Sequence, residues 1–310
     1  MAGLHEGNTT STNWPAPPYL LERSTAAPPR RPVGGADYPR SQQEFDDWFP
    51  DDAACIEYLA QLRWPNGFVC PACGDDRSWH TGTLSRICVA CGRRTSATSG
   101  TIFHRSHAPI STWFAAIWFV TAGRNGVSAR DLQRAVGLGS YETAWAWLQK
   151  LRRAMVDPEP GQLVGTVELD ETPVDSQGGT AVPRAAVLVA VERLGKHRLG
   201  HLRLELAERA HHAGRLLDFA QRTVVPDATI RLHADAPGAR RVAADLGRWF
   251  AGTLHHRVSR EHLPYYLDEY AFRFDRRTST GRGLLFYELL RRAVATDPHP
   301  LAQLVRRHTP

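Results

Sequence analysis

The sequence has no apolar stretch that is long enough to cross a membrane. Its longest apolar run, Trp113–Val120, has eight residues, whereas a membrane-spanning helix needs about 20. The N-terminus lacks the basic and then apolar segments of a secretory signal, and five cysteines in 310 residues are too few for a disulfide scaffold. These absences predict a cytoplasmic protein without a membrane partner.

Lysine is almost absent as well, because all but two of the 38 basic residues are arginines. The guanidinium group is planar and suits bidentate contacts with phosphates and base edges, although the codon bias of a genome gives the same composition. The formal net charge is +6. This composition permits a nucleic-acid partner without establishing one.

Residues 1–40 are rich in proline, glycine, serine and threonine and have no sustained periodicity, which predicts a disordered tail. Beyond this tail, apolar residues recur at helical spacing, and Asp51–Asp52 provides an N-cap for a helix over about 52–63. Trp64-Pro-Asn-Gly67 is a turn signal that ends this helix. Residues 297–310 are predicted as a second tail.

Four cysteines form two matched pairs, Cys70-Pro-Ala-Cys73 and Cys88-Val-Ala-Cys91, which fourteen residues separate. Each C-x-x-C knuckle presents two thiolates to one tetrahedral ion, so the two pairs predict a structural zinc site. Four thiolates leave no open coordination position, and this zinc therefore stabilises the fold without doing chemistry. A redox dithiol is the competing interpretation. Cys55 is predicted as a core residue rather than a fifth ligand.

Residues 111–157 are predicted to form a small helical domain of the helix-turn-helix type. Ser128-x-x-Asp131 resembles a capping box that opens a short helix. Gly137–Ser140 is a turn, and a longer helix with basic residues near its end follows. Any small helical bundle can have this pattern, so it is weak evidence for DNA binding when taken alone.

Basic charge is concentrated in this part of the chain. Between residues 61 and 155, basic residues exceed acidic residues by eight, which is more than the excess over the whole chain. A zinc ribbon followed by a basic helix-turn-helix points to the phosphates of double-stranded DNA, and the competing interpretation is a solvated basic surface. The predicted DNA-binding residues are Arg93, Arg94, Arg130, Lys150, Arg152 and Arg153. Three later arginines either track phosphates or lie on an amphipathic helix that packs on a sheet: Arg273, Arg276 and Arg277.

The second half of the chain has the periodicity of strands and then of helices. Apolar patterning predicts three successive strands in antiparallel hairpins, then a helix and a fourth strand. The strands are expected over 163–170, 185–191, 201–206 and 228–234. The helices are expected over 210–223, 238–250, 259–272 and 282–295.

Two carboxylates lie within or directly after strands of this predicted pattern. Asp170 lies inside the first predicted strand and Asp235 follows the fourth. On neighbouring strands they can hold divalent metal, and paired Mg²⁺ ions activate water and stabilise the leaving oxygen in phosphodiester chemistry. Strand alternation places Glu168 on the face of Asp170 and Glu171 on the other. The competing interpretation is that these are ordinary acids of edges and turns.

Motifs in two parts of the chain carry a family resemblance. Around the cysteines they are Asp52-x-x-Cys-x-x-Tyr-Leu59, Trp64-Pro-Asn-Gly67 and Thr98-Ser-Gly-Thr-Ile-Phe103. In the second half they are Val167-Glu-Leu-Asp-Glu-Thr172, His262–Tyr270, Phe272–Arg277 and Arg282–Phe286. Together they resemble the bacterial insertion-sequence transposases that carry an N-terminal zinc ribbon, over about residues 41–295.

This resemblance implies an RNase-H-like domain of the DDE type, which cuts and joins DNA strands with two Mg²⁺ or Mn²⁺ ions. It implies that Asp170 and Asp235 are the first and second catalytic aspartates. The implied partners are the DNA of the element ends and of the target, with a homo-oligomer assembled on DNA in the nucleoid.

The sequence departs from the family pattern after Asp235. The family continues with Asp-Gly and an aromatic residue, whereas this chain has Asp235-Ala-Pro237. Arg241–Thr253 resembles the helix that carries the third catalytic residue, yet it begins six residues after Asp235. A helix and a fifth strand of the family core are therefore expected to be missing, together with the third catalytic residue and a family lysine that would fall on Gly247.

The predicted fold class is thus α+β with several domains. They are a helix plus zinc ribbon over 41–110, a helix-turn-helix domain over 111–157, and an RNase-H-like mixed-sheet domain over 162–296 that lacks a segment after residue 235. The expected function is that of a DNA-binding transposase. An internal deletion is expected to impair its catalysis, so the sequence leaves open whether the chain is an active enzyme. The alternatives are an inactive DNA-binding regulator that recognises element ends and a zinc ribbon that binds protein.

Overall fold

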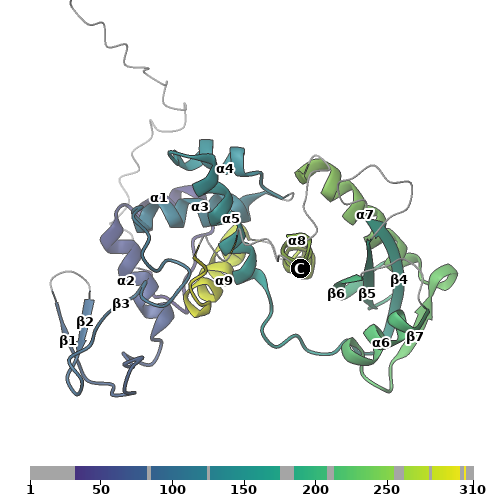
Figure 1. Ribbon diagram of the computed structural model, residues 1–310, viewed down its shortest axis with the longest axis horizontal. Helices are drawn as coiled ribbons and strands as arrows, with labels where there is room; N and C mark the ends of the chain where they lie inside the picture. The colour runs from purple at the N-terminus through teal and green to yellow at the C-terminus, as the bar shows by residue number, and fades with distance from the viewer. Residues whose placement is uncertain are drawn as a thin grey trace, which may run out of the picture. The chain divides into compact units, whose positions relative to one another are not determined.

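The structure is a computed structural model that describes residues 32–81, 85–123, 126–174, 185–207, 213–254, 262–278, 281–300 and 304 (Figure 1). Residues 1–31 of the predicted N-terminal tail lie outside this set. None of the helices in the described ranges is both long enough and apolar enough to span a bilayer.

One hydrophobic core is built from helices on both sides of the zinc ribbon and from the last helix of the chain. These helices are α1 (Gln42–Trp48), α2 (Asp52–Arg63), α3 (Ile110–Ala122), α4 (Ala129–Val136), α5 (Tyr141–Met155) and α9 (Arg282–Ala295). The stacked rings of Trp113 and Trp147, with centroids 3.6 Å apart, join α3 to α5. The bounds of α2 confirm the helix predicted over 52–63. Ser128 caps α4 by accepting the N–H of Asp131, so the capping-box prediction is also confirmed.

Helix α9 belongs to this helical core and not to the sheet. Its residues Phe286 and Leu289 are fully buried there, and the ring of Phe286 lies 5.5 Å from Phe45 and 5.6 Å from Trp118. The sequence-based boundary of 162–296 is therefore wrong for this helix. An amphipathic pattern predicts that a helix face is buried, but it does not specify the element that covers that face.

Residues 32–40 are also part of the folded chain, although the sequence predicts a tail up to residue 40. The hydroxyl of Tyr58 on α2 donates to the carbonyl of Asp37, and Tyr38 packs against Tyr287 of α9 with ring centroids 6.0 Å apart. These contacts come from elements that lie far away in the sequence. At the other end, Leu304 is buried within the predicted tail 297–310.

The zinc-ribbon region contains a small antiparallel sheet. Its strands are β1 (Ser78–His80), β2 (Ser85–Cys88) and β3 (Arg94–Ser96), in the order β1-β2-β3. Before this sheet, the predicted turn closes where the N–H of Gly67 donates to the carbonyl of Trp64. Arg63 joins the ribbon to α2 by donating to the carbonyls of Ser96 and Ala97, each at 2.9 Å.

A second sheet has the strand order β6-β5-β4-β7. Its strands are β4 (Thr166–Val174), β5 (Ala185–Arg193), β6 (Leu199–Ala207) and β7 (Thr229–Leu232). The first three pair antiparallel, as predicted, and β7 pairs parallel to β4. Helix α6 (Ala213–Thr223) covers one face, while α7 (Pro237–Leu254) and α8 (Leu263–Asp275) cover the other (Figure 1).

Candidate functional site

The four knuckle cysteines lie together in the structure. Their sulfur atoms are all within 4.8 Å of one another, with 3.6 Å between Cys70 and Cys91 and 3.5 Å between Cys73 and Cys88. A tetrahedral zinc with Zn–S bonds of about 2.3 Å requires sulfur separations of about 3.8 Å. The site therefore has the size and the ligand set that zinc requires. Cys55 is fully buried in the helical core, as predicted.

The two knuckles have the same backbone turn. Gly74 donates to the carbonyl of Cys70 at 2.9 Å and Gly92 donates to that of Cys88 at 3.0 Å, and both glycines have a positive φ, of 78° and 70°. Hydrogen bonds from backbone N–H groups, first of all that of Ala72, lower the pKa of the Cys70 thiol to about 6. A thiolate at this position is the form that ligates metal.

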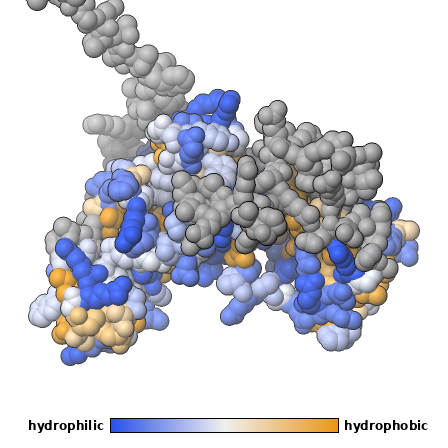
Figure 2. Space-filling view, in the orientation of Figure 1, coloured by the Kyte–Doolittle hydropathy of each residue, from blue (hydrophilic) through white to orange (hydrophobic). Residues whose placement is uncertain are grey.

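The predicted DNA-binding residues fall into two groups. Arg93 and Arg94 on the ribbon and Arg130 on α4 are exposed, and the space-filling view shows hydrophilic patches over both regions (Figure 2). Lys150 is turned inward instead, since its ammonium donates to the carbonyl of Ile102 at 3.3 Å and burial lowers its pKa. Arg153 is half-buried and stacks over the ring of Tyr265 at 4.3 Å.

Arg152 is a core residue, and the structure contradicts a DNA contact at this position. Its side chain is only 2% exposed, and its Nε donates to Glu269 of α8 at 2.8 Å. Glu269 also accepts two hydrogen bonds from Arg273, at 2.8 and 3.0 Å. Of Arg273, Arg276 and Arg277, two likewise make hydrogen bonds to other elements of the fold. Arg273 donates to carbonyls at the end of α3, and Arg277 donates to carbonyls at the start of β6.

Asp170 lies on the central strand β4. It pairs in register with Val189, and Glu168 pairs with Val191, so both acids share the face covered by α7 and α8. Glu171 pairs with Leu188, which belongs to the opposite face. These positions confirm the predicted alternation.

The carboxylate of Asp170 is 13% exposed and lies 3.5 Å from Nδ1 of His233. His233 directly follows β7, and its φ of +46° is unusual for a residue other than glycine. Asp235 lies two residues further on, in the one-turn helix η2 (His233–Asp235), and is exposed. Within the described ranges, the four cysteines are the only cluster of three or more possible metal ligands.

Glu168 has a role that the sequence does not reveal. It is fully buried, and its carboxylate accepts the N–H groups of Gly238 and Ala239 at the start of α7 and pairs with Arg193. A carboxylate at this place is favoured by the helix dipole. A Cβ atom on Gly238 would lie 2.8 Å from Glu168 Oε2 and 2.7 Å from Leu199, so a larger residue there would have to displace one of these side chains. Glu168 thus fixes the start of α7 directly after β7.

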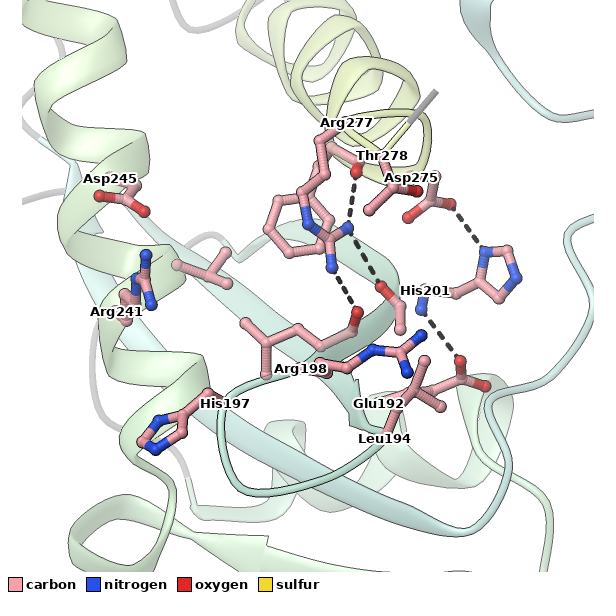
Figure 3. Close-up of a pocket in the computed structure, with 14 residues that line it drawn as sticks. Glu192, Leu194, His197, Arg198, His201, Arg241, Asp245, Asp275, Arg277 and Thr278 are labelled. Carbon is pink, nitrogen blue, oxygen red and sulfur yellow. Dashed lines mark hydrogen bonds and ion pairs between the residues drawn. The ribbon is translucent and has the colours of Figure 1, made fainter. Parts of the chain in front are cut away.

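A pocket of about 560 Å³ that is lined by three arginines and three acids lies between the β5–β6 hairpin, α7 and α8 (Figure 3). Arg198 and Arg241 line it beside Arg277. Two of these acids bind backbone N–H groups of β6, since Glu192 accepts that of His201 and Asp275 accepts that of Leu202, and the third, Asp245, pairs with Arg248. Asp170 and Asp235 are not among the lining residues, so this pocket is separate from them.

Comparison with known proteins bears on the first part of the chain. Residues 50–94 match the family of transposase zinc-ribbon domains of the IS1595 type. This stretch is similar to a transposase zinc ribbon. A stretch of 127 residues is also 32% identical to an uncharacterized protein in transposable element ISH50 of Halobacterium salinarum, covering 40% of this chain and 42% of that protein. No solved structure matches significantly.

These two matches support a place for the chain in the insertion-sequence transposase family with an N-terminal zinc ribbon. The matched stretch includes the four cysteines of the metal site and ends at Arg94, so the exposed Arg93 and Arg94 lie within it. The chain spans about two fifths of the length of the curated relative that it matches.

Proposed function

We propose that the chain is a DNA-binding transposase of an insertion sequence, located in the nucleoid. The observation that carries this proposal is the match of residues 50–94 to transposase zinc ribbons, in a chain that continues into the helices α4 and α5 and into a sheet with Asp170 on a central strand. The proposed partners are double-stranded DNA at element ends and at the target, and further copies of the chain on that DNA. The four cysteines hold structural zinc.

The proposed catalytic domain is RNase-H-like and of the DDE type, and it begins near residue 162. Three antiparallel strands, a helix and a parallel fourth strand bring Asp170 next to the end of β7, which supports this assignment. In such a domain Asp170 and Asp235 would hold Mg²⁺ or Mn²⁺, ions that activate water for attack on a phosphodiester.

We further propose that cutting and joining are impaired. Helix α7 starts at Pro237, directly after η2, so the described chain has no room between them for a further helix and strand. Strand β7 is an edge of the sheet, and its residues Ile230 and Leu232 are 43% and 39% exposed. Asp245 is the acid nearest to the expected third position, and it pairs with Arg248 on the same helix.

DNA binding is tested by measuring affinity for a duplex over a range of salt concentrations. The logarithm of the affinity is expected to fall by about 0.9 per contacted phosphate for each tenfold increase in salt. Replacing both Arg93 and Arg94 with alanine is expected to weaken binding and to reduce this slope by about two. Arg222→Ala, on the exposed surface of α6, is the matched control. Binding that does not depend on salt would favour the protein-binding alternative.

Catalysis is tested separately, with a plasmid that carries the element ends and with Mg²⁺ or Mn²⁺. Impairment predicts binding with little cleavage, which is also the behaviour of the alternative, a regulator that recognises element ends. A gain in thermal stability on addition of Mn²⁺ that Asp170→Asn abolishes would show that the metal site survives. Cleavage at rates typical of transposases that depends on Asp170 would refute impairment.

A further inference from the structure

The outward face of the ribbon sheet carries an exposed tryptophan. Trp79 on β1 is 66% exposed, more than the other large apolar residues described. It pairs in register with Ile87 on β2, and Ile87 pairs with Arg94 on β3. Because directly paired residues share a face, these three side chains form one row across the sheet, which we call the Trp79 row.

The opposite face of the same sheet is already covered. Arg86 lies there, over the rings of Trp64 and Phe68 at 5.6 and 5.9 Å, and it contacts His80 at 3.0 Å. The small core of the ribbon is therefore on that side, and it leaves Trp79 no packing role. A single exposed ring is ordinary on a protein surface, so the residues around Trp79 decide whether it has a ligand.

The charge around the Trp79 row indicates the kind of ligand. Arg94 is the last residue of the row, Arg93 precedes Arg94 in the sequence, and both arginines are exposed. The guanidinium of Arg94 also contacts the hydroxyl of Thr81 at 3.5 Å. Of the two acids that precede β1, Asp75 is only 19% exposed and is paired with Arg77 at 2.9 Å, while Asp76 is exposed. This combination of an aromatic ring and basic side chains fits a nucleic acid.

We propose that the Trp79 row binds unpaired DNA bases, with Trp79 stacking on a base and with Arg93 and Arg94 contacting its flanking phosphates. An aromatic side chain on the surface of a sheet can reach the flat face of an unpaired base, whereas the bases of a duplex must first be unstacked. This inference rests on the proposed function. It adds that the ribbon distinguishes opened or single-stranded DNA from intact duplex.

The test compares the zinc-loaded full chain with its variants, using a short single-stranded oligonucleotide and a duplex of the same sequence. Trp79→Ala is expected to weaken single-strand binding about five- to 150-fold, as the loss of one stacked base does. Duplex binding is expected to change by less than about twofold, because phosphate contacts dominate it. Trp79→Phe, which keeps a ring, is expected to restore most of the single-strand affinity. Leu217→Ala, another exposed apolar residue at 55%, is the matched control.

Three results would overturn the inference: equal losses on both DNA forms, no loss on either form, or self-association that depends on Trp79 while DNA affinity does not. The last result would indicate a protein contact instead. Zinc content is measured for each variant, so that a collapsed ribbon is recognised. The proposed function fails only if the wild-type chain lacks salt-dependent duplex binding, and the two failures are therefore distinguishable.

Discussion

Glu269 is a single buried carboxylate that receives two guanidinium groups. Burial raises its pKa, but Arg152 and Arg273 lower it further, so the net shift is downward and the group is ionised in the folded protein. Arg152 also lies 3.9 Å over the ring of Tyr266, and Arg273 donates to the carbonyl of Val120 at 2.7 Å. One residue on α8 therefore joins α3, α5 and α8 through charged hydrogen bonds.

Replacing Arg152 with methionine should destabilise the protein by about 3–5 kcal/mol, because Glu269 would lose a partner inside the core. Urea unfolding measures this loss. Arg130→Met, at an exposed position on α4, should change the free energy of unfolding by less than about 0.5 kcal/mol. If Arg152 contacts DNA instead, its replacement should reduce DNA affinity and leave stability unchanged.

The neighbouring Asp268 should make stability depend on pH in a defined window. Burial raises the pKa of its carboxyl from 3.8 to about 6. A raised folded-state pKa means that ionising the group costs stability above about pH 6, while the cost is absent below about pH 3.8. Asp268→Asn should therefore stabilise the protein by about 1–3 kcal/mol at pH 7, and the gain should vanish towards pH 4. Denaturant unfolding across this range measures it, and an equal gain at both pH values would contradict this account.

At the scale of elements, the edge of β6 depends on the end of α8. Asp275 accepts the N–H of Leu202 at 2.8 Å. The guanidinium of Arg277, labelled in Figure 3, binds the carbonyls of Leu199 and Gly200. Backbone groups on an edge strand are otherwise a template for pairing with another chain. Side chains from α8 thus occupy the start of this edge.

Asp275→Ala should leave the N–H of Leu202 without its acceptor. The expected loss of stability is about 1–3 kcal/mol, accompanied by faster aggregation as the edge becomes available. Light scattering at elevated temperature measures the second effect. Asp218→Ala, at an exposed position on α6, is the control. Aggregation that is equally slow in both variants would show that this carboxylate does not protect the edge.

The sequence predicts the elements well but not their partners. Strand alternation and capping residues act over a few positions, so β4, β5, β6, α2 and α4 follow from local patterns. The burial of Arg152 depends on Glu269, which is 117 positions away, and nothing near Arg152 distinguishes it from an arginine that binds phosphate. The role of Glu168 as a cap of α7 is hidden for the same reason, because the two are joined only by the folded sheet.

At the scale of the whole molecule, the described chain has several separate cores. The helical core and the two faces of the large sheet each bury many apolar side chains. Among the described residues, the core of the ribbon consists of Phe68, Cys70 and Cys88, with Trp64 packed beside it. So few side chains cannot offset the entropy of ordering the strands, and metal binding must supply the difference.

Removal of zinc with a strong chelator should therefore unfold the ribbon alone. Amide hydrogen exchange should become fast in β1–β3, while α3 and β5 keep their protection because their cores contain no metal ligand. Cys88→Ser should reproduce this pattern and lose the bound zinc, whereas Cys55→Ala, in the helical core, should keep it. Loss of protection throughout the chain would mean that the ribbon and the helical core fold as one cooperative unit. Unchanged exchange in β1–β3 would mean that the ribbon is stable without metal.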